Sequence, residues 1–349
     1  MRDVAIVSFA QSAKARELRN EIEILMPVVH EAVGASRMPR TEIGFTCSGS
    51  SDYLQGQSFA FVGALDAVGA WPPIRESHVE MDGAWALYEA WIKIQTGDVD
   101  SALVYSFGKS SPGDIAEVLA LQLDPYTVTP LWPDAHSLAA IQARAFLEAT
   151  GKSERELAEV VARSRRSAIG NPHAVVSGEF SVEKLLAEPY VSSPLRAHDL
   201  PPVTDGASAL VMVAGERARQ LCERPVWIRG IDHRIEPQSL GARELVRSAS
   251  SEIAGAKAGV HKGKVDFAEL HAPYSHQELI LRAALGLGEN VKINPSGGAL
   301  ASHALMAAGL VRIGEAAARI MAGHGDRAVA HATQGPCLQQ NLVCVLEGD

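Results

Sequence analysis

HVEMDGAWALYEAWIKIQTGDVDSALVYSFGKS, residues 78–110, is the stretch that decides the fold, because it holds one complete structural unit. A loop leads into a helix that begins with small residues, a Gly97-Asp98 turn follows, and an apolar strand closes the unit. The same layout returns in residues 302–337, where a long helical pattern reaches a Gly325-Asp326 turn before its strand. We therefore predict a duplicated α/β chain with two pseudo-equivalent halves.

The segments that precede each unit repeat as well. Each half opens with an apolar strand, continues with a helix, and reaches a second strand that ends in a polar loop. These segments are residues 3–10, 21–36 and 42–51 in the first half, and residues 224–234, 242–260 and 265–275 in the second half. Strands that alternate with helices predict a parallel or mixed sheet.

The chain divides into three parts on this pattern. We predict that residues 1–111 and 201–219 form the N-terminal half, that 220–349 form the C-terminal half, and that 112–200 are a helical insertion. Ser153 and Glu156 form a capping box at the start of one helix of the insertion. We expect this loop domain to lie over one face of the two halves.

Composition excludes several classes of protein. The chain has 349 residues, of which 47% are hydrophobic, and a net charge of -9 without a basic run, which argues against nucleic-acid binding. No apolar run reaches the length of a membrane span. The four cysteines form no C-x-x-C pair, so zinc-ribbon and thioredoxin-like sites are unsupported, and a reducing cytoplasm is expected.

The most informative loop is in VKINPSGGALASHALMAAG, residues 291–309. Its tight turn contains Asn294, Ser296, Gly297 and Gly298, and the two glycines allow backbone to approach a ligand closely. We predict that these four residues bind substrate. Alone, the segment also fits a helix-starting loop in which His303 is incidental.

Three other stretches join this loop in a recognisable order: EMDG at 80–83, SPLRAHDLPPVTDGASALVMV at 193–213 and FAELHAPYSHQELILRAALGL at 267–287. Together with the duplicated halves, they resemble the thiolase superfamily. The nearest likeness is to the sterol-carrier-protein-type thiolases and to the lipid-transfer-like steroid side-chain aldolases of actinobacteria. The resemblance implies the thiolase fold, a five-layered αβαβα arrangement of two pseudo-equivalent halves with a helical loop-domain insertion.

The resemblance also shows what is missing. The family's nucleophilic cysteine lies in a C-A-S-G motif at a helix N-terminus, where the helix field lowers a thiol pKa, and the matching position here is Glu80. The second catalytic cysteine, in H-D-C-F, matches Pro273. The histidines of H-D-C-F and of G-H-P match His271 and His303, which in the family hold the oxygen of an acyl-thioester enolate.

Chemistry that needs no thiol is therefore expected. Retro-aldol cleavage of a 3-hydroxyacyl-CoA requires a base for the hydroxyl proton and donors for the leaving enolate. We predict that His271 and His303 hold the enolate and that Tyr274 carries the proton transfer, unless Tyr274 is a core residue with a satisfied hydroxyl. Glu80 is either a base with a raised pKa or a structural carboxylate that caps the helix N-terminus. Cys337 is either a reactive thiol or a small buried hydrophobe.

The resemblance further implies partners and alternatives. It predicts an acyl-CoA substrate with a bulky sterol-type tail, a small OB-fold acyl-CoA-binding partner protein, and a homodimer that pairs through the strand at 101–110. No cofactor is expected apart from the coenzyme A of the substrate, and no metal, because His271, His276 and His303 lack a carboxylate to complete a site. The alternatives are a catalytically silent thiolase-like subunit and an acyltransferase that uses Cys337.

Overall fold

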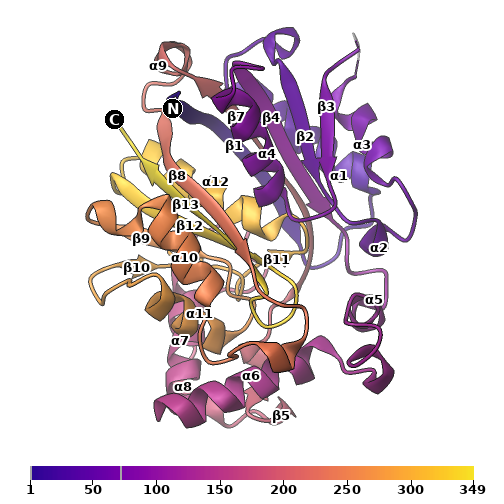
Figure 1. Ribbon diagram of the computed structural model, residues 1–349, viewed down its shortest axis with the longest axis vertical. Coiled ribbons are helices and arrows are strands. Elements are labelled where there is room, and N and C mark those ends of the chain that lie inside the picture. Colours follow the sequence, from indigo (N-terminus) through magenta and orange to yellow (C-terminus); the bar gives the residue numbers. More distant parts are fainter. Residues whose placement is uncertain (1, 71–72) are drawn as a thin grey trace.

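The computed structural model describes residues 2–70 and 73–349 (Figure 1). The strands of the N-terminal half are β1 (Val4–Lys14), β2 (Phe45–Gly49), β3 (Glu76–Val79), β4 (Ser101–Gly108) and β7 (Val203–Ala214). Those of the C-terminal half are β8 (Val226–Ile235), β9 (Phe267–Leu270), β10 (Lys292–Ile293), β12 (Arg327–Gln334) and β13 (Gln340–Glu347). A further short strand, β11 (His303–Ala304), pairs with β7.

The two sets of strands have the same topology. Their orders are β1-β7-β4-β2-β3 and β8-β13-β12-β9-β10. In each set the first two pairings are antiparallel and the last two are parallel. Two residue pairs, Ala5 with Trp227 and Ile6 with Val226, join β1 to β8. This repetition confirms the prediction of two pseudo-equivalent α/β halves.

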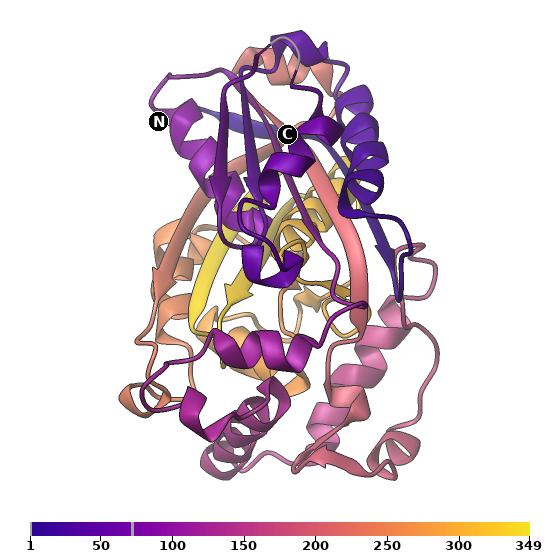
Figure 2. The same ribbon diagram turned by 90° about the vertical axis from the view of Figure 1, so that its right-hand side faces the viewer.

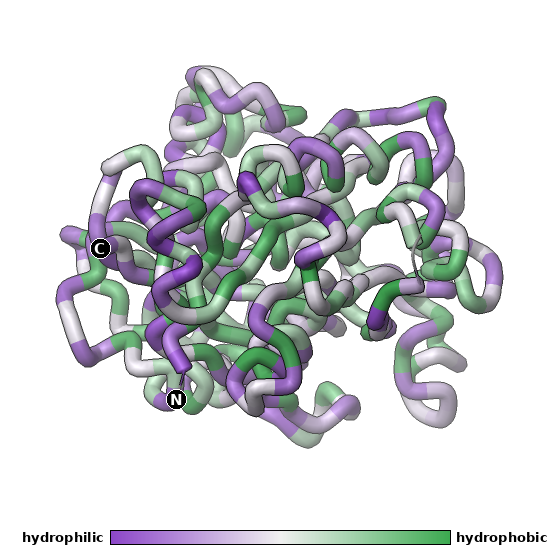
Figure 3. Tube along the Cα trace, turned by 90° about the horizontal axis from the view of Figure 1, so that it is seen from above, coloured by the Kyte–Doolittle hydropathy of each residue, from purple (hydrophilic) through white to green (hydrophobic). Residues whose placement is uncertain are grey.

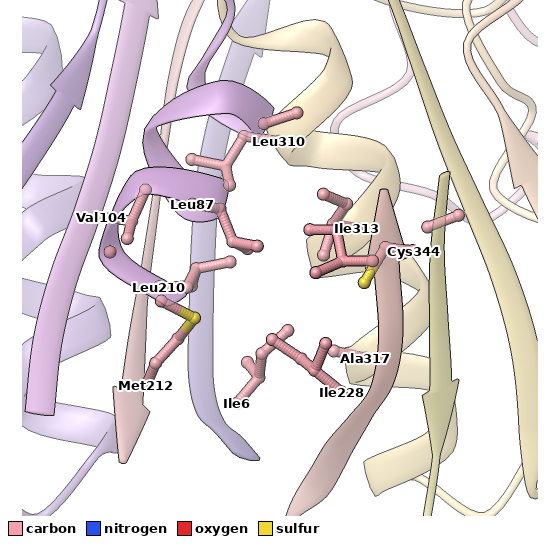
Figure 4. Close-up of a cluster of buried hydrophobic side chains, with 14 of the residues drawn as sticks. Ile6, Leu87, Val104, Leu210, Met212, Ile228, Leu310, Ile313, Ala317 and Cys344 are labelled. Carbon is pink, nitrogen blue, oxygen red and sulfur yellow. The ribbon is translucent and has the colours of Figure 1, made fainter. Parts of the chain in front are cut away.

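Helices pack in three layers around the strands. The central layer is formed by α4 (Gly83–Gln95) and α12 (Ala308–Met321), whose apolar side chains meet strands of both halves in one buried cluster (Figure 4). The outer layers are formed by α1 (Glu21–Ala35) and α3 (Phe61–Val68) on one side, and by α10 (Ala249–Ala258) and α11 (Ser275–Ala284) on the other. The five-layered arrangement is thus confirmed.

The apolar side chains of the central layer are buried. Leu87 of α4 and Ile313 of α12 are fully buried, and Figure 4 shows both within this cluster. Burial of each such side chain contributes roughly 1.5–3 kcal/mol. Figure 3 shows hydrophobic stretches running through the middle of the trace. This packing holds the first turns of α4 and α12 in fixed positions.

Residues between β4 and β7 form mainly helices: α5 (Ile115–Leu121), α6 (Ala135–Thr150), α7 (Glu154–Ser167) and α8 (Val182–Leu186), with a small sheet of β5 (Tyr190–Ser192) and β6 (Leu195–Arg196). The capping box at the start of α7 is present, because the Ser153 N–H donates to Glu156 over 2.7 Å. Helices α6 and α7 contact α11 of the C-terminal half and lie at the lower end of Figures 1 and 2. The residue limits given for the three parts stay a prediction.

The strand expected to pair in a dimer is an interior strand. Both edges of β4 are hydrogen-bonded, one to β2 and one to β7, and all its residues are buried. A second chain has no free edge of β4 to bind, so the prediction of pairing through residues 101–110 is wrong. The outer strand of this half is β3.

Two short helices complete the fold, α2 (Asp52–Gln55) and α9 (Glu216–Leu221). Among the helices of the described residues, none combines the length and the apolarity that a membrane crossing requires.

Candidate active site

His271 and His303 meet inside the protein. His271 directly follows β9, and His303 begins β11, which pairs in parallel with Val203 and Thr204 of β7. Both imidazoles are buried, and their Nε2 atoms lie 2.9 Å apart, which is hydrogen-bond distance. The fold therefore brings together the two histidines that the motif order predicted.

The surroundings set the protonation of this pair. The Thr333 N–H donates to His271 Nδ1 over 3.3 Å, so the proton of a neutral His271 is on Nε2 and points at His303. Burial, and then the neighbouring His303, hold the pKa of His271 well below its ordinary value. Burial lowers the pKa of His303 to about 4. Both rings are neutral hydrogen-bonding groups at pH 7.

The glycine-rich turn supports His271 from behind. Asn294 Oδ1 accepts from the Leu270 N–H over 2.6 Å, and Asn294 Nδ2 donates to Glu278 over 3.2 Å. The Ser296 hydroxyl donates to Glu269 over 2.7 Å and accepts from Arg312 over 2.6 Å. These side chains are directed into the fold, and the predicted role of the turn in substrate binding stays a prediction.

The two glycines of this turn are needed for packing. Gly297 and Gly298 have φ of 101° and 64°. A Cβ on Gly297 would lie 2.6 Å from the Ala168 Cβ, and one on Gly298 would lie 2.6 Å from the Asn294 side chain. Only glycine fits this turn without moving α7's end or Asn294.

Tyr274 lies three residues after His271, at the start of α11, and has a partner that the sequence did not reveal. Its hydroxyl is 3.0 Å from His136 Nδ1, and His136 comes from α6 of the insertion. Burial raises the pKa of Tyr274 above its ordinary value, so the phenol keeps its proton at pH 7. No motif marks His136, because its role depends on how α6 packs against α11.

Glu80 does not cap the helix that follows it. Its side chain is 46% exposed, accepts from the Asp52 N–H of α2 over 2.6 Å, and lies 3.3 Å from His78 Nε2. The predicted cap of α4 by Glu80 is wrong, because Asp82 is the N-cap residue. An aspartate just before the helical Gly83 is the ordinary N-cap signal, and it could have been recognised. Whether Glu80 takes part in catalysis stays a prediction.

Asp82 caps two helices at once. Its Oδ1 accepts from the N–H groups of Ala84 over 2.9 Å and Leu310 over 3.0 Å, and its Oδ2 accepts from the Gly309 N–H over 2.8 Å. Burial raises the pKa of Asp82 to about 7 in spite of these three donors. The two central helices therefore begin at a single buried carboxylate.

Cys337 lies among apolar side chains. Its Sγ is 3.5 Å from the Leu138 carbonyl oxygen, and it packs in a small cluster with Leu123 and Leu138. Burial raises the pKa of the Cys337 thiol to about 12, so the thiolate needed for nucleophilic attack is scarce at pH 7. Within residues 2–70 and 73–349, no group of three or more histidine, cysteine or acidic side chains is arranged to hold a metal ion.

Comparisons with known proteins agree with this picture. No protein-family model matches the chain. An acetyl-CoA acetyltransferase of Methanocaldococcus jannaschii is 27% identical over 350 aligned positions, which cover 90% of this chain and 89% of that protein. A 17-hydroxy-3-oxo-4-pregnene-20-carboxyl-CoA lyase of Mycobacterium tuberculosis is 28% identical over 159 positions, which cover 42% of this chain and 41% of the lyase.

Solved structures share the whole fold. A structure titled Ltp2-ChsH2(DUF35) aldolase superposes with a TM-score of 0.84 at 18% identity, covering 99% of this chain and 98% of that one. A human mitochondrial 3-ketoacyl-CoA thiolase superposes with a TM-score of 0.79 at 16% identity, covering 99% and 98%. At these identities the superpositions show the fold alone. They show that this chain has the thiolase fold, and the sequence similarity along nearly the whole chain shows that it resembles members of the thiolase superfamily.

Proposed function

We propose that the protein is a carbon–carbon lyase that cleaves a 3-hydroxyacyl-CoA with a bulky, sterol-type side chain by a retro-aldol reaction. The observation that carries this proposal is the buried contact of 2.9 Å between the Nε2 atoms of His271 and His303. The matched thiol positions hold Glu80 and Pro273, so the covalent acyl-cysteine route lacks its nucleophile, while the enolate donors are kept.

The reaction follows from this arrangement. The C3 hydroxyl of the substrate gives its proton to Tyr274 while the phenol of Tyr274 releases its own proton, which ends in solvent. The C3 oxygen becomes a carbonyl, and the C2–C3 bond breaks. The electron pair of that bond forms a thioester enolate, whose oxygen accepts from His271 and from His303 once His303 carries its proton on Nε2. The enolate carbon takes a proton from solvent, and the products are a ketone or aldehyde and a shorter acyl-CoA. Each oxyanion donor contributes roughly 3 kcal/mol of transition-state stabilisation.

Two known proteins support this choice over an acyltransferase. One relative is named as a steroid carboxyl-CoA lyase, and one structural neighbour is titled an aldolase. The acetyltransferase relative favours transfer of an acyl group, but that reaction needs a thiolate, and burial disfavours this form of Cys337.

The proposed assembly is a homodimer that binds a small OB-fold partner protein, and this partner is able to hold acyl-CoA. We place the assembly in the cytoplasm. The structural neighbour, an aldolase that joins Ltp2 to ChsH2(DUF35), supports a partner subunit. Coenzyme A enters as part of the substrate. The alternative function is a silent subunit that binds acyl-CoA or lipid and supports an active paralogue.

An activity assay tests the proposal directly. The purified protein, alone and with a candidate small OB-fold partner protein, is incubated with a 3-hydroxyacyl-CoA that carries a branched sterol-type tail, and products are followed by mass spectrometry. We expect a carbonyl product and a shorter acyl-CoA in equal amounts. His303→Ala and Tyr274→Phe should each slow the formation of both products roughly 100-fold or more, whereas His30→Gln, which changes an exposed histidine of α1, should not.

Absence of cleavage with the partner present would refute the lyase. If acyl-CoA still bound tightly, the silent subunit would become the preferred function. Cleavage that survived His303→Ala unchanged would leave the activity standing but remove the predicted enolate site.

A further inference from the structure

We propose that His136, on the inserted helix α6, accepts the proton that Tyr274 passes on when Tyr274 deprotonates the substrate. This inference rests on the proposed lyase function and adds a positioning residue that acts through Tyr274. It is carried by the 3.0 Å contact between His136 Nδ1 and the Tyr274 hydroxyl. The contact joins the insertion to the segment that also contains His271.

The helix start holds His136 in place. Asp134 is the N-cap of α6 and accepts from the Ser137 N–H over 2.9 Å and from the Ser137 hydroxyl over 2.6 Å. His136 is therefore the second residue of a capped helix, and its ring meets that of Tyr274 at an interplanar angle of 74° with centroids 5.9 Å apart. This edge-on approach points a ring nitrogen at the phenol oxygen.

Tyr274 alone is a poor base. Burial raises the pKa of its hydroxyl, so at pH 7 the phenol is protonated and can accept a proton only if it releases its own. Burial also lowers the pKa of His136, although Asp134 works in the opposite direction. A neutral imidazole at 3.0 Å is a suitable acceptor for the phenol proton.

The protons balance in this relay. The substrate hydroxyl proton moves to the Tyr274 oxygen while the phenol proton moves to His136 Nδ1, and the C2–C3 bond breaks as above. Asp134 lies close enough to stabilise the imidazolium that forms. His136 then loses its proton to solvent. This loss balances the proton that the enolate carbon takes up from solvent.

In the part of the chain that the structure describes, His276, Cys337 and Asp134 are the other titrating groups near the pair. From the start of α11, His276 lies 6.1 Å from the Tyr274 ring, and burial lowers the pKa of His276 to about 3, so it stays neutral. The Cys337 thiol is near Tyr274 and also stays neutral, because burial raises its pKa to about 12. Asp134 is the charged group that acts on His136 from its own helix. A loss of activity as the pH falls below the ordinary pKa of a histidine would thus report His136.

The matched variants are His136→Gln and His30→Gln. Glutamine keeps a hydrogen-bond acceptor for the Tyr274 hydroxyl but cannot take up a proton near neutral pH. We expect His136→Gln to lower kcat roughly 100- to 10,000-fold, the range for loss of a proton-transfer group, with KM changed little. Tyr274→Phe should lower kcat by a similar factor, and the double variant should lose no more than the larger single loss, because the two residues act as one unit.

The pH profile separates this role from simple packing. In the wild-type protein, kcat should rise with pH through the pKa of His136, and this acid limb should be absent in His136→Gln. A proton inventory in mixed H2O and D2O needs no variant, so it decides the question even if His136→Gln fails to fold. A curved inventory, with two protons in flight, is expected for the relay.

Each failure has its own signature. If the wild-type protein cleaves no 3-hydroxyacyl-CoA, the proposed function falls and this inference falls with it. If the wild-type protein is active but His136→Gln keeps its kcat and its acid limb, or the inventory is linear, then the relay alone is overturned.

Discussion

His271 and His303 are 32 residues apart in the chain, yet they share one hydrogen bond in the interior. Motif order predicted both residues, because each stands at a position where the thiolase superfamily has a histidine. Their shared contact and the Thr333 N–H that sets the His271 tautomer could not be predicted, because β12 reaches His271 only through sheet pairing. At the residue scale, the sequence therefore singles out the two histidines, and packing brings them together and sets their protonation.

Cys337 provides a test at the residue scale. Because its pKa is raised to about 12 by burial, we expect Cys337 to resist alkylation by iodoacetamide at pH 7.5, and Cys337→Ser to leave turnover unchanged. Half-buried Cys222 is the internal control and should be labelled faster. Peptide mass spectrometry measures both. If Cys337→Ser lost turnover while its fold stayed intact, the result would favour the alternative function, an acyltransferase that uses Cys337.

Glu80 provides a second test. Its carboxylate is 46% exposed and accepts from the Asp52 N–H, which glutamine can also do through its side-chain oxygen. We expect Glu80→Gln to change kcat less than roughly threefold, well below the effect of removing a general base. Steady-state kinetics of cleavage measures the effect. A loss of roughly 100-fold or more would instead make Glu80 the base.

At the scale of elements, the central helices depend on Asp82. Three N–H groups, one from α4 and two from α12, share its carboxylate away from water. The repeat of helix, Gly-Asp turn and strand predicted α4 and α12 as elements. Their common cap was not predicted, because two segments that start more than 200 residues apart meet there.

Loss of this cap should be costly. We expect Asp82→Ala to lower the free energy of unfolding by about 2–3 kcal/mol, because about 1 kcal/mol per capped helix adds to the cost of leaving buried donors unpaired. Asn20→Ala, which removes the cap of the surface helix α1, should cost only about 1 kcal/mol. Guanidinium chloride titrations compare the two. If both variants lowered the free energy of unfolding equally, capping two helices with one carboxylate would stabilise the protein no more than an ordinary cap.

At the scale of the whole molecule, several buried histidines make stability depend on pH. Burial lowers the pKa of His303 and His331 to about 4 and that of His276 to about 3, whereas all three titrate near 6.5 when unfolded. The unfolded chain therefore binds more protons below pH 6.5, and stability falls as pH falls. We expect a loss of ~2 kcal/mol per histidine between pH 7 and 5, measured from denaturant midpoints.

Asp82 works in the opposite direction and offers a control. Its folded pKa of about 7 lies above the ordinary value, so its contribution is complete at low pH and is lost as pH rises toward 7. Asp82→Asn should therefore steepen the loss of stability on acidification, and His303→Asn should make it shallower. If neither variant changed the slope of stability against pH, the pKa values of Asp82 and His303 would be the same in the folded and unfolded states.

The sequence by itself determined the resemblance to the thiolase superfamily, the duplicated α/β architecture, the absence of cysteine at positions 80 and 273, and the two histidines of the candidate site. These features depend on residue identity and short-range order. Tertiary structure alone decided that β4 is interior, that Asp82 caps both central helices, and that His136 meets Tyr274. These contacts join segments far apart in the chain, and only the packing of sheets and helices sets which distant groups touch.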